Sequence, residues 1–315
     1  MQMSAKLRDW AVFAALGLTW GSSFMWIKIA VAETAPLTVV GLRLMFGWLG
    51  MLGIVWWKKT RLPRDRATWL KLLFLGFLNT ALPFSLITWG ETRIDSGLAS
   101  ILNGTVPLFT IVIAHLFLHD EKITLPRIGG LIGGFLGVAV LFSRDLNLQG
   151  ALASNLLGQL AVLVASLCYG TAIVFSRRQL RNVNPIVQSL GVLVIADTLV
   201  WVAALGLESP LTLPVLPITW LAIVWLGLLG SCLAYLMFYH LINVWGSTRT
   251  SLVTYIMPVV GLVLGIVFLD EVLDWRLLVG SALITSGIVL ANRIPRPVRA
   301  TADMHAGQII PENRI

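Results

Sequence analysis

Long apolar segments follow one another along almost the whole chain, and only short links separate them. A transmembrane helix needs about 20 mostly apolar residues, and ten segments approach or exceed that length. Charged residues make up 12% of the chain, against about 25% in a soluble domain, so lipid must surround most of the surface. The sequence therefore predicts an all-α integral membrane protein with ten transmembrane helices. Their expected bounds are 10–31, 37–57, 69–90, 96–118, 126–142, 155–176, 186–206, 217–240, 249–269 and 276–292.

The fourth and ninth segments carry the same pattern. Each predicts an apolar helix with small and polar residues on one face, a proline near its middle and an acidic pair at its end. The acidic pairs are Asp120–Glu121 and Asp270–Glu271. The two polar faces match at an offset of 151 residues: Gly97, Ser100, Asn103, Gly104, Pro107 and Thr110 in one, and Thr248, Ser251, Thr254, Tyr255, Pro258 and Gly261 in the other.

This pattern indicates that the chain is built twice. Five spans in each half is an odd number, so the second half must enter the membrane in the opposite orientation. The sequence therefore predicts two inverted five-helix repeats, residues 1–147 and 148–292, related by an axis in the membrane plane. The polar tail 293–315 is expected to be disordered.

Lysine and arginine concentrate on one side of the predicted spans. If the N-terminus is inside the cell, most of the 23 basic residues lie in inner loops or tails, as cytoplasmic segments require. Both termini are therefore expected in the cytoplasm. The same charges are spread over short loops instead of one patch, so we expect no nucleic-acid partner.

Several motifs in both halves match a known family. They are LTWGSSFMWIK, PLTVVGLRL and GLASILNGTVPLF with LHDE in the first half, and TSLVTYIMPVVGLVLG with LDE and GSALITSGIVLAN in the second. With these motifs, residues 8–292 resemble bacterial drug/metabolite transporters of the EamA type. The resemblance implies ten helices, alternating access and a central cavity lined by the first, third, fourth, sixth, eighth and ninth segments. It also implies an inner-membrane secondary transporter that moves a small metabolite, such as an amino acid or related compound, as an exporter.

Other functions stay open at this point: an integral membrane enzyme that acts on lipid, a carrier for drug or cation efflux, and a uniporter. An enzyme would need paired acid and base groups or metal ligands at one interface, and the sequence holds no HExxH, Walker loop, GxSxG or Cys–His arrangement. We therefore expect no enzymatic activity, no metal and no cofactor. The expected partners are a small-molecule substrate and the lipid bilayer, for a monomer or a homodimer.

The candidate binding residues are polar or aromatic side chains in the cavity-lining segments. The amide of Asn103 could contact substrate or join neighbouring helices, and the rings could gate, stack on substrate or only pack. The candidates are Trp20, Ser23, Lys28, Asn79, Ser100, Asn103, Tyr169, Ser231, Tyr235, Thr254 and Tyr255.

Two prolines are expected to kink the matching helices. Pro107 and Pro258 each remove the hydrogen bond to the carbonyl four residues earlier, at Asn103 and Thr254. That carbonyl must find a partner in lipid. It could therefore line a cavity, or the kink could only serve packing.

Three ionisable residues lie within predicted spans. Lys28 either attracts a carboxylate of the substrate or extends to the outer headgroups. Arg43 either joins helices or binds an anion. Asp197 is a candidate for proton coupling, with a structural hydrogen bond as the alternative.

A strip of glycines in the fifth segment allows close contact with another helix. That helix belongs either to the same subunit or to a second copy. The strip consists of Gly129, Gly130, Gly133, Gly134 and Gly137.

Overall fold

The computed structural model describes residues 5–118, 123–143, 152–245, 250 and 252–292. Helix is the only regular secondary structure in these ranges. Eight helical stretches are long and apolar enough to cross a membrane, and two shorter apolar helices, Val253–Leu269 and Trp275–Ala291, accompany them. The structure therefore confirms an all-helical integral membrane protein. Ten spans and an inverted repeat stay predictions, and Asp120–Glu121, Thr248, Ser251 and the tail 293–315 lie outside the described residues.

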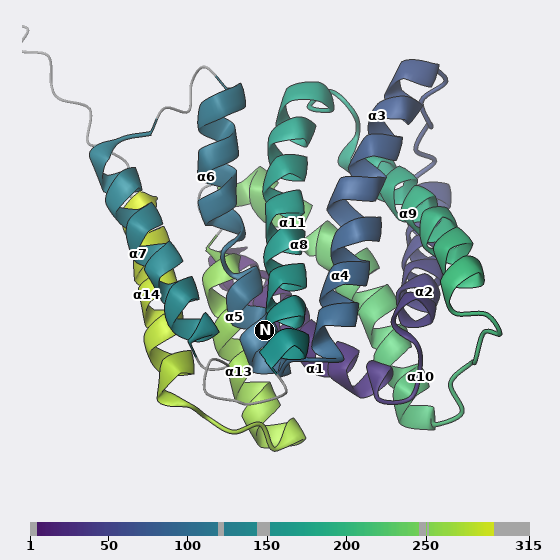
Figure 1. Ribbon diagram of the computed structural model, residues 1–315. Helices are drawn as coiled ribbons and strands as arrows, with labels where there is room; N and C mark the ends of the chain where they lie inside the picture. Colours follow the sequence, from purple (N-terminus) through teal and green to yellow (C-terminus); the bar gives the residue numbers. More distant parts are fainter. Residues whose placement is uncertain (1–4, 119–122, 144–151, 246–249, 251, 293–315) are drawn as a thin grey trace, which may run out of the picture.

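Short links join the helices, most of which run along one common direction (Figure 1). Prolines occupy the first turn of several of them, where a missing N–H group costs nothing. In chain order the elements are α1 (Ala5–Val31), α2 (Pro36–Trp57), α3 (Arg66–Gly76), η1 (Phe77–Ala81), α4 (Leu82–Glu91), α5 (Ser96–Asn103), α6 (Val106–Phe117), α7 (Leu125–Phe142), α8 (Leu152–Gln179), α9 (Pro185–Leu207), α10 (Pro217–Val224), η3 (Trp225–Leu233), α11 (Ala234–Trp245), α13 (Val253–Leu269) and α14 (Trp275–Ala291).

Two long helices contain a π-helical segment, which the apolar pattern does not predict. The segment η1 joins α3 to α4, and η3 joins α10 to α11. An offset of 151 residues places Phe77 of η1 opposite Leu228 of η3, so both segments occupy matching positions in the two halves. π-Helical turns are rare and occur frequently at functional sites.

The structure differs from the expected pair of kinks at Pro107. Helix α5 ends at Asn103, Gly104 and Thr105 form a turn, and Pro107 lies in the first turn of α6. Pro258 instead lies inside the continuous helix α13. The break follows from the local sequence, because glycine favours leaving the helix just where proline prevents its continuation.

Helices α7 and α14 pack along their length at one edge of the bundle (Figure 1). A Cβ atom at Gly130 would lie 2.7 Å from the backbone nitrogen of Ala291, and one at Gly287 would lie 2.7 Å from that of Gly134. The glycine strip therefore faces a helix of the same chain, which favours the interpretation of packing within the subunit.

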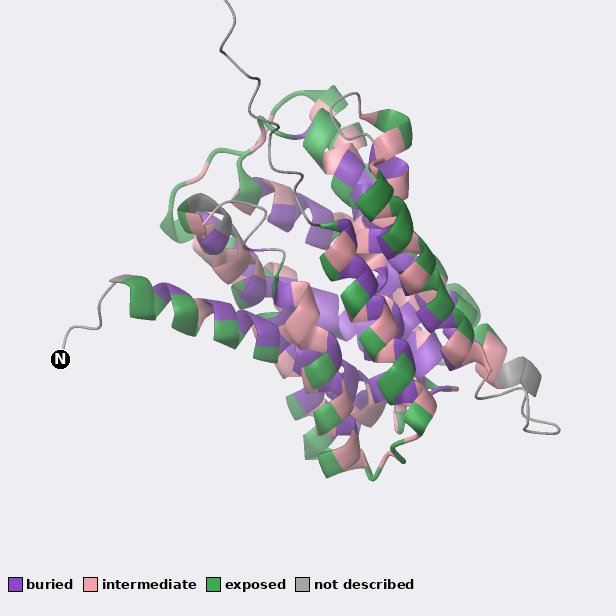
Figure 2. Cartoon of the chain, turned by 90° about the vertical axis from the view of Figure 1, so that its left-hand side faces the viewer, coloured by how far each residue is buried: buried purple, intermediate pink, exposed green. Residues whose placement is uncertain are grey.

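The outside of the bundle is apolar. Buried residues gather on the inner helix faces, and large hydrophobic side chains such as Leu70, Leu116, Val202 and Phe268 are largely exposed (Figure 2). A surface of this kind suits contact with lipid chains.

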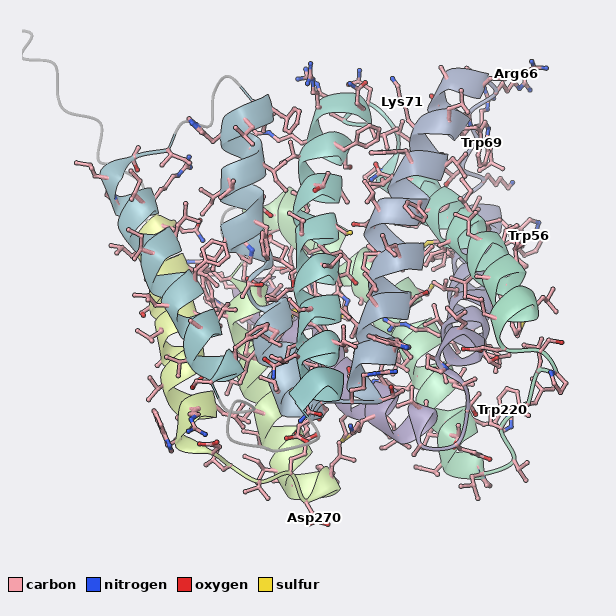
Figure 3. The ribbon with its side chains drawn as sticks, viewed as in Figure 1. Trp56, Arg66, Trp69, Lys71, Trp220 and Asp270 are labelled. Atoms are coloured by element: carbon pink, nitrogen blue, oxygen red, sulfur yellow. The ribbon has the colours of Figure 1, made fainter. Side chains whose placement is uncertain are left out.

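The two ends of the bundle differ in charge. Arg66 and Lys71 lie at one end, which we call the basic end, and Asp270 lies at the other, which we call the acidic end (Figure 3). The links from α1 to α2, α4 to α5, α9 to α10 and α13 to α14 all lie at the acidic end (Figure 1).

Candidate functional site

Polar side chains from both halves of the chain meet between the helices, in a group that we call the central polar cluster. Elements of the first half, α1, α2 and η1, provide four of these side chains, and α8, η3 and α11 of the second half provide three. The members are Trp20, Ser23, Arg43, Asn79, Tyr169, Ser231 and Tyr235.

Arg43 is the cation of this cluster. Its side chain on α2 is only 6% exposed. The Nε atom donates a hydrogen bond to Oγ of Ser231 at 3.2 Å, and the guanidinium carbon lies 4.0 Å from the centre of the Phe84 ring. Arg43 also interacts electrostatically with Tyr169 and Tyr235. A planar guanidinium held in this way is well suited to bind a carboxylate or another planar anion.

The two π-helical segments supply polar groups to the cluster. Asn79 of η1 donates from Nδ2 to the hydroxyl of Tyr235 at 3.3 Å. In η3, the hydroxyl of Ser231 donates to the carbonyl of Leu226 at 3.0 Å, so the wide turn satisfies the serine within its own helix. These turns therefore bring two predicted site residues into one cluster, although the residues are distant in sequence.

Helix α1 contributes Trp20 and Ser23. The indole Nε1 of Trp20 donates to the carbonyl of Gly230 at 3.2 Å, and its ring lies 5.4 Å from that of Phe238. A Cβ atom at Gly230 would lie 3.4 Å from Oγ of Ser23, so this serine also borders η3. Trp20 thus closes one side of the cluster with an aromatic ring.

Among the described residues, Lys28 pairs with no carboxylate and is held by the backbone instead. Its Nζ atom donates to the backbone carbonyls of Glu91 at 2.6 Å and Ile94 at 2.8 Å. The lysine therefore caps the C-terminal end of α4, where a cation is favourable.

Three carboxylates at the acidic end each cap the N-terminal end of a helix in the other half. Glu271 accepts from the backbone N–H groups at the start of α5, Glu208 accepts from those at the start of α2, and Glu33 accepts from those before α10. Anionic side chains are stabilising at such sites. The two halves are therefore joined by hydrogen bonds at this end.

Glu33 accepts hydrogen bonds from three donors. The hydroxyl of Thr219 donates to it, and so do the backbone N–H groups of Leu216 at 2.9 Å and Val215 at 2.6 Å. These hydrogen bonds, that of Thr219 foremost, lower the pKa of Glu33 below its ordinary value. Glu33 is therefore ionised at neutral pH.

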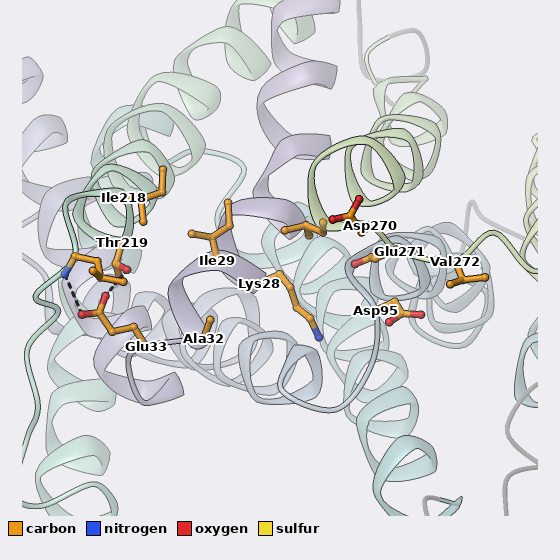
Figure 4. A pocket seen from close by; sticks show the side chains of 12 residues that line it. Lys28, Ile29, Ala32, Glu33, Asp95, Ile218, Thr219, Asp270, Glu271 and Val272 are labelled. Carbon is orange, nitrogen blue, oxygen red and sulfur yellow. Dashed lines mark hydrogen bonds between the residues drawn. The ribbon is translucent and has the colours of Figure 1, made fainter.

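A cleft of about 650 Å³ opens at the acidic end. Glu33 and Thr219 lie at one side of it, Asp95 and Glu271 lie at the other, and Lys28 lies between them (Figure 4). The cleft is therefore acidic around a single lysine among its lining residues.

The other predicted site residues lie outside the central polar cluster. Ser100 is 1% exposed, donates to the carbonyl of Gly97 at 2.7 Å and packs on α13. Asn103 ends α5, and its Oδ1 atom is buried without a hydrogen-bond partner among the described residues. Thr254 is half-buried in the first turn of α13. The hydroxyl of Tyr255 accepts from Nδ2 of Asn292 at 2.9 Å.

Asp197 lies between α9 and α2. Its Oδ2 atom accepts a hydrogen bond from Nε1 of Trp48 at 2.9 Å. This contact favours the structural alternative for Asp197 over a role in proton coupling. Within the described residues, no group of three His, Cys, Asp or Glu side chains could hold a metal ion.

Sequence reasoning missed Glu91. This residue directly follows the apolar run FSLITWG, so the expected spans leave it in a link, whereas the structure buries it completely at the end of α4. A carboxylate that adjoins an apolar segment near a lysine of another span was the available signal. It was weak because the distance between them depends on tertiary packing.

The chain is similar to known proteins. The family model described as EamA-like transporter family matches twice, at residues 9–143 and 156–293. A transporter of Bacillus subtilis, YoaV, is 27% identical over 87% of this chain and 92% of its own length. The inner membrane transporter YedA of Escherichia coli K12 is 29% identical over 80% of this chain and 79% of its own length. Both are named as uncharacterized transporters.

A similar fold occurs in a solved crystal structure. It superposes with a TM-score of 0.65 over 91% of this chain and 98% of the other, at 18% sequence identity. At this identity the likeness concerns the fold alone.

Proposed function

The chain belongs to the EamA-like transporter family, and we propose that it is a secondary transporter that moves a small metabolite by alternating access between its two halves. The class of substrate is an amino acid or a related compound, and the direction is export. The central polar cluster is the observation that carries this proposal. It gathers a cation, an amide, hydroxyls and rings from both halves in an otherwise apolar bundle.

The two halves form the repeats 1–147 and 148–292, inverted relative to each other, with ten spans in total. The matching positions of η1 and η3 support this arrangement, as does the double match to the family model. An inverted repeat gives two states of similar energy that open to opposite sides. Substrate would reach the central polar cluster from one side in each state.

In the present conformation hydrogen bonds join the two halves at the acidic end, which we assign to the outer side of the membrane. The carboxylates Glu33, Glu208 and Glu271 join the halves there. The basic end then faces the cytoplasm with both chain termini, in agreement with the positive-inside rule. In this assignment the substrate enters from the cytoplasm and leaves when the contacts at the acidic end separate.

The chemistry of the site favours a substrate with two different ends. Arg43 would bind a carboxylate, and the amide oxygen of Asn79 in the same cluster would accept a hydrogen bond from an amino group. An α-amino acid offers one group of each kind. The rings of Trp20, Tyr169 and Tyr235 would contact its side chain.

A direct test uses the purified full-length protein. A thermal-shift screen of the L-amino acids identifies compounds that stabilise the folded state, because a ligand that binds only the native protein raises its stability. Those compounds are then loaded as radiolabelled solutes into proteoliposomes, and their efflux is compared with that from protein-free vesicles. Faster efflux of at least one amino acid supports the proposal. If the full set leaves both vesicle types at equal rates, the proposed substrate class is wrong.

A further inference from the structure

Glu91 is a fully buried carboxyl group to which the proposed function assigns no role. It ends α4, its side chain is 0% exposed, and neither carboxyl oxygen has a hydrogen-bond partner among the described residues. An ionised carboxylate removed from water without donors is strongly unfavourable. Such a group must be neutralised by a proton or by a cation that moves toward it.

Charged groups face Glu91 from three neighbouring elements. Lys28 of α1, Arg43 of α2 and Glu271 after α13 all interact with it electrostatically. Tyr169 of α8 interacts electrostatically with Arg43. Asp95 lies in the link after α4 and lines the cleft.

Both cations now direct their hydrogen bonds elsewhere. Lys28 donates to backbone carbonyls, and Nε of Arg43 donates to Ser231. Neither donates to the carboxyl group itself. Both cations nevertheless interact with it electrostatically, so the charge of Glu91 depends on the conformation of its neighbours.

Glu91 also lies between the two polar regions of the molecule. Lys28 lines the cleft at the acidic end and at the same time binds the backbone of Glu91. Arg43 belongs to the central polar cluster and faces Glu91 from the other side. A change at the substrate site and a change at the cleft therefore both reach this carboxyl group.

We propose that Glu91 is the group that takes up and releases one proton in each transport cycle, so that the protein exchanges substrate for protons. In the conformation described here Glu91 holds its proton. When substrate binds from the cytoplasm, the ammonium group of Lys28 turns from the end of α4 to Glu91, the O–H bond of the acid breaks, and the proton passes to water on the cytoplasmic side. When the acidic end opens, the substrate leaves and Glu91 takes up a proton from water in the cleft. This inference rests on the proposed transport function but not on the identity of the amino acid.

The test uses proteoliposomes with an acidic lumen and a mixture of radiolabelled L-amino acids outside. An outward proton gradient of about one pH unit can drive about tenfold accumulation of amino acid in the lumen if one proton leaves for each substrate molecule that enters. We expect the wild type to accumulate label when the gradient is present. Glu91→Gln should lose this response and still exchange internal label for unlabelled amino acid. Asp197→Asn is the matched control, because Asp197 has a donor in Trp48, and it should respond as the wild type does.

The results separate the two proposals. If the wild type moves no amino acid, the proposed substrate class fails. If it exchanges amino acids but ignores the gradient, or if Glu91→Gln still accumulates label, the assignment of Glu91 is wrong while transport stands. Loss of the response in Asp197→Asn alone would also overturn the assignment.

A second measurement decides the case in which Glu91→Gln neither transports nor folds. Dicyclohexylcarbodiimide reacts with protonated carboxyl groups in apolar surroundings: the acid adds across a C=N bond, and the adduct rearranges to a stable N-acylurea. We expect mass spectrometry of the treated wild type to locate the adduct on Glu91 and its yield to fall as pH rises. An unmodified Glu91 across the range from acidic to neutral pH would refute the proposal.

Discussion

The carboxylate of Glu271 accepts a hydrogen bond from the backbone N–H of Ser96 at 2.6 Å, across a sequence separation of 175 residues. Its second oxygen accepts from Gly97 at 2.9 Å. Asp270, just before it, adopts the left-handed conformation with φ of 54°, and this turn ends α13 and directs the chain toward α5. The acidic pair of the repeated motif thus joins the two halves at the acidic end.

Replacement of Glu271 by alanine should weaken this closure. Loss of a helix cap costs about 0.5–2 kcal/mol, so thermal stability should fall, and the cleft should open more often. We expect a membrane-impermeant maleimide to label Ile29→Cys, which lines the cleft, faster in the Glu271→Ala background. Asp274→Ala is the control, because Asp274 caps its own helix α14. Equal labelling in both backgrounds would show that Glu271 does not hold the halves together.

Arg43→Lys should impair transport although it retains the charge. Lysine cannot reproduce the planar stacking on Phe84 together with the bond to Ser231. We expect initial flux per protein molecule to fall by about tenfold or more, the equivalent of one charged hydrogen bond. Arg93→Lys is the matched control, because Arg93 also stacks on a ring, that of Trp89, but at the surface. A normal flux in Arg43→Lys would remove Arg43 from the site.

Asn103→Ala should lower flux without lowering the amount of protein in the membrane. The buried Oδ1 atom has no partner among the described residues, so its removal should not destabilise the fold. Loss of a hydrogen bond to substrate is worth about 1 kcal/mol, which predicts a decrease in flux of roughly fivefold. Flux and abundance are measured on the same vesicles, and unchanged flux would exclude contact of Asn103 with substrate.

The contact of Glu33 with the start of α10 should depend on pH. Its pKa is lower in the folded protein than the ordinary value of 4.5, so ionised Glu33 stabilises the fold above that value. The contribution is lost as pH falls through the lower, folded pKa. We expect the wild type to melt above Glu33→Gln at neutral pH, and this difference to vanish in acid. A difference that persists in acid would contradict the assignment.

The packing of α7 on α14 should not tolerate a larger residue at Gly130. A Cβ atom there would lie 2.7 Å from the backbone nitrogen of Ala291, and backbone atoms cannot yield as a flexible side chain can. Gly130→Ala should therefore reduce the yield of folded protein in detergent. Gly53→Ala is the control, because nothing lies within 4 Å of a Cβ atom at Gly53, and alanine favours helix by about 1 kcal/mol.

Much of the helical architecture could be predicted, because in lipid the formation of each helix depends mainly on its own segment of sequence. A backbone without water must satisfy its own hydrogen bonds, so each apolar run becomes helix whatever its neighbours are. The spacing of the glycines around Gly130 likewise predicted close contact with another helix. Polar residues in apolar runs, such as Asn79 and Ser231, could be predicted as site candidates, because a polar side chain in lipid is unfavourable in free energy and therefore suggests a function.

The local sequence therefore accounts for the apolar helices and for the polar groups that they carry. Which of these groups meet depends on tertiary packing. It placed Arg43 beside Ser231, turned Lys28 from the substrate to the end of α4, and buried Glu91 between them. The physical reason is that helix formation depends on neighbours along the chain, whereas these contacts depend on how each helix rotates and packs against residues far away in sequence.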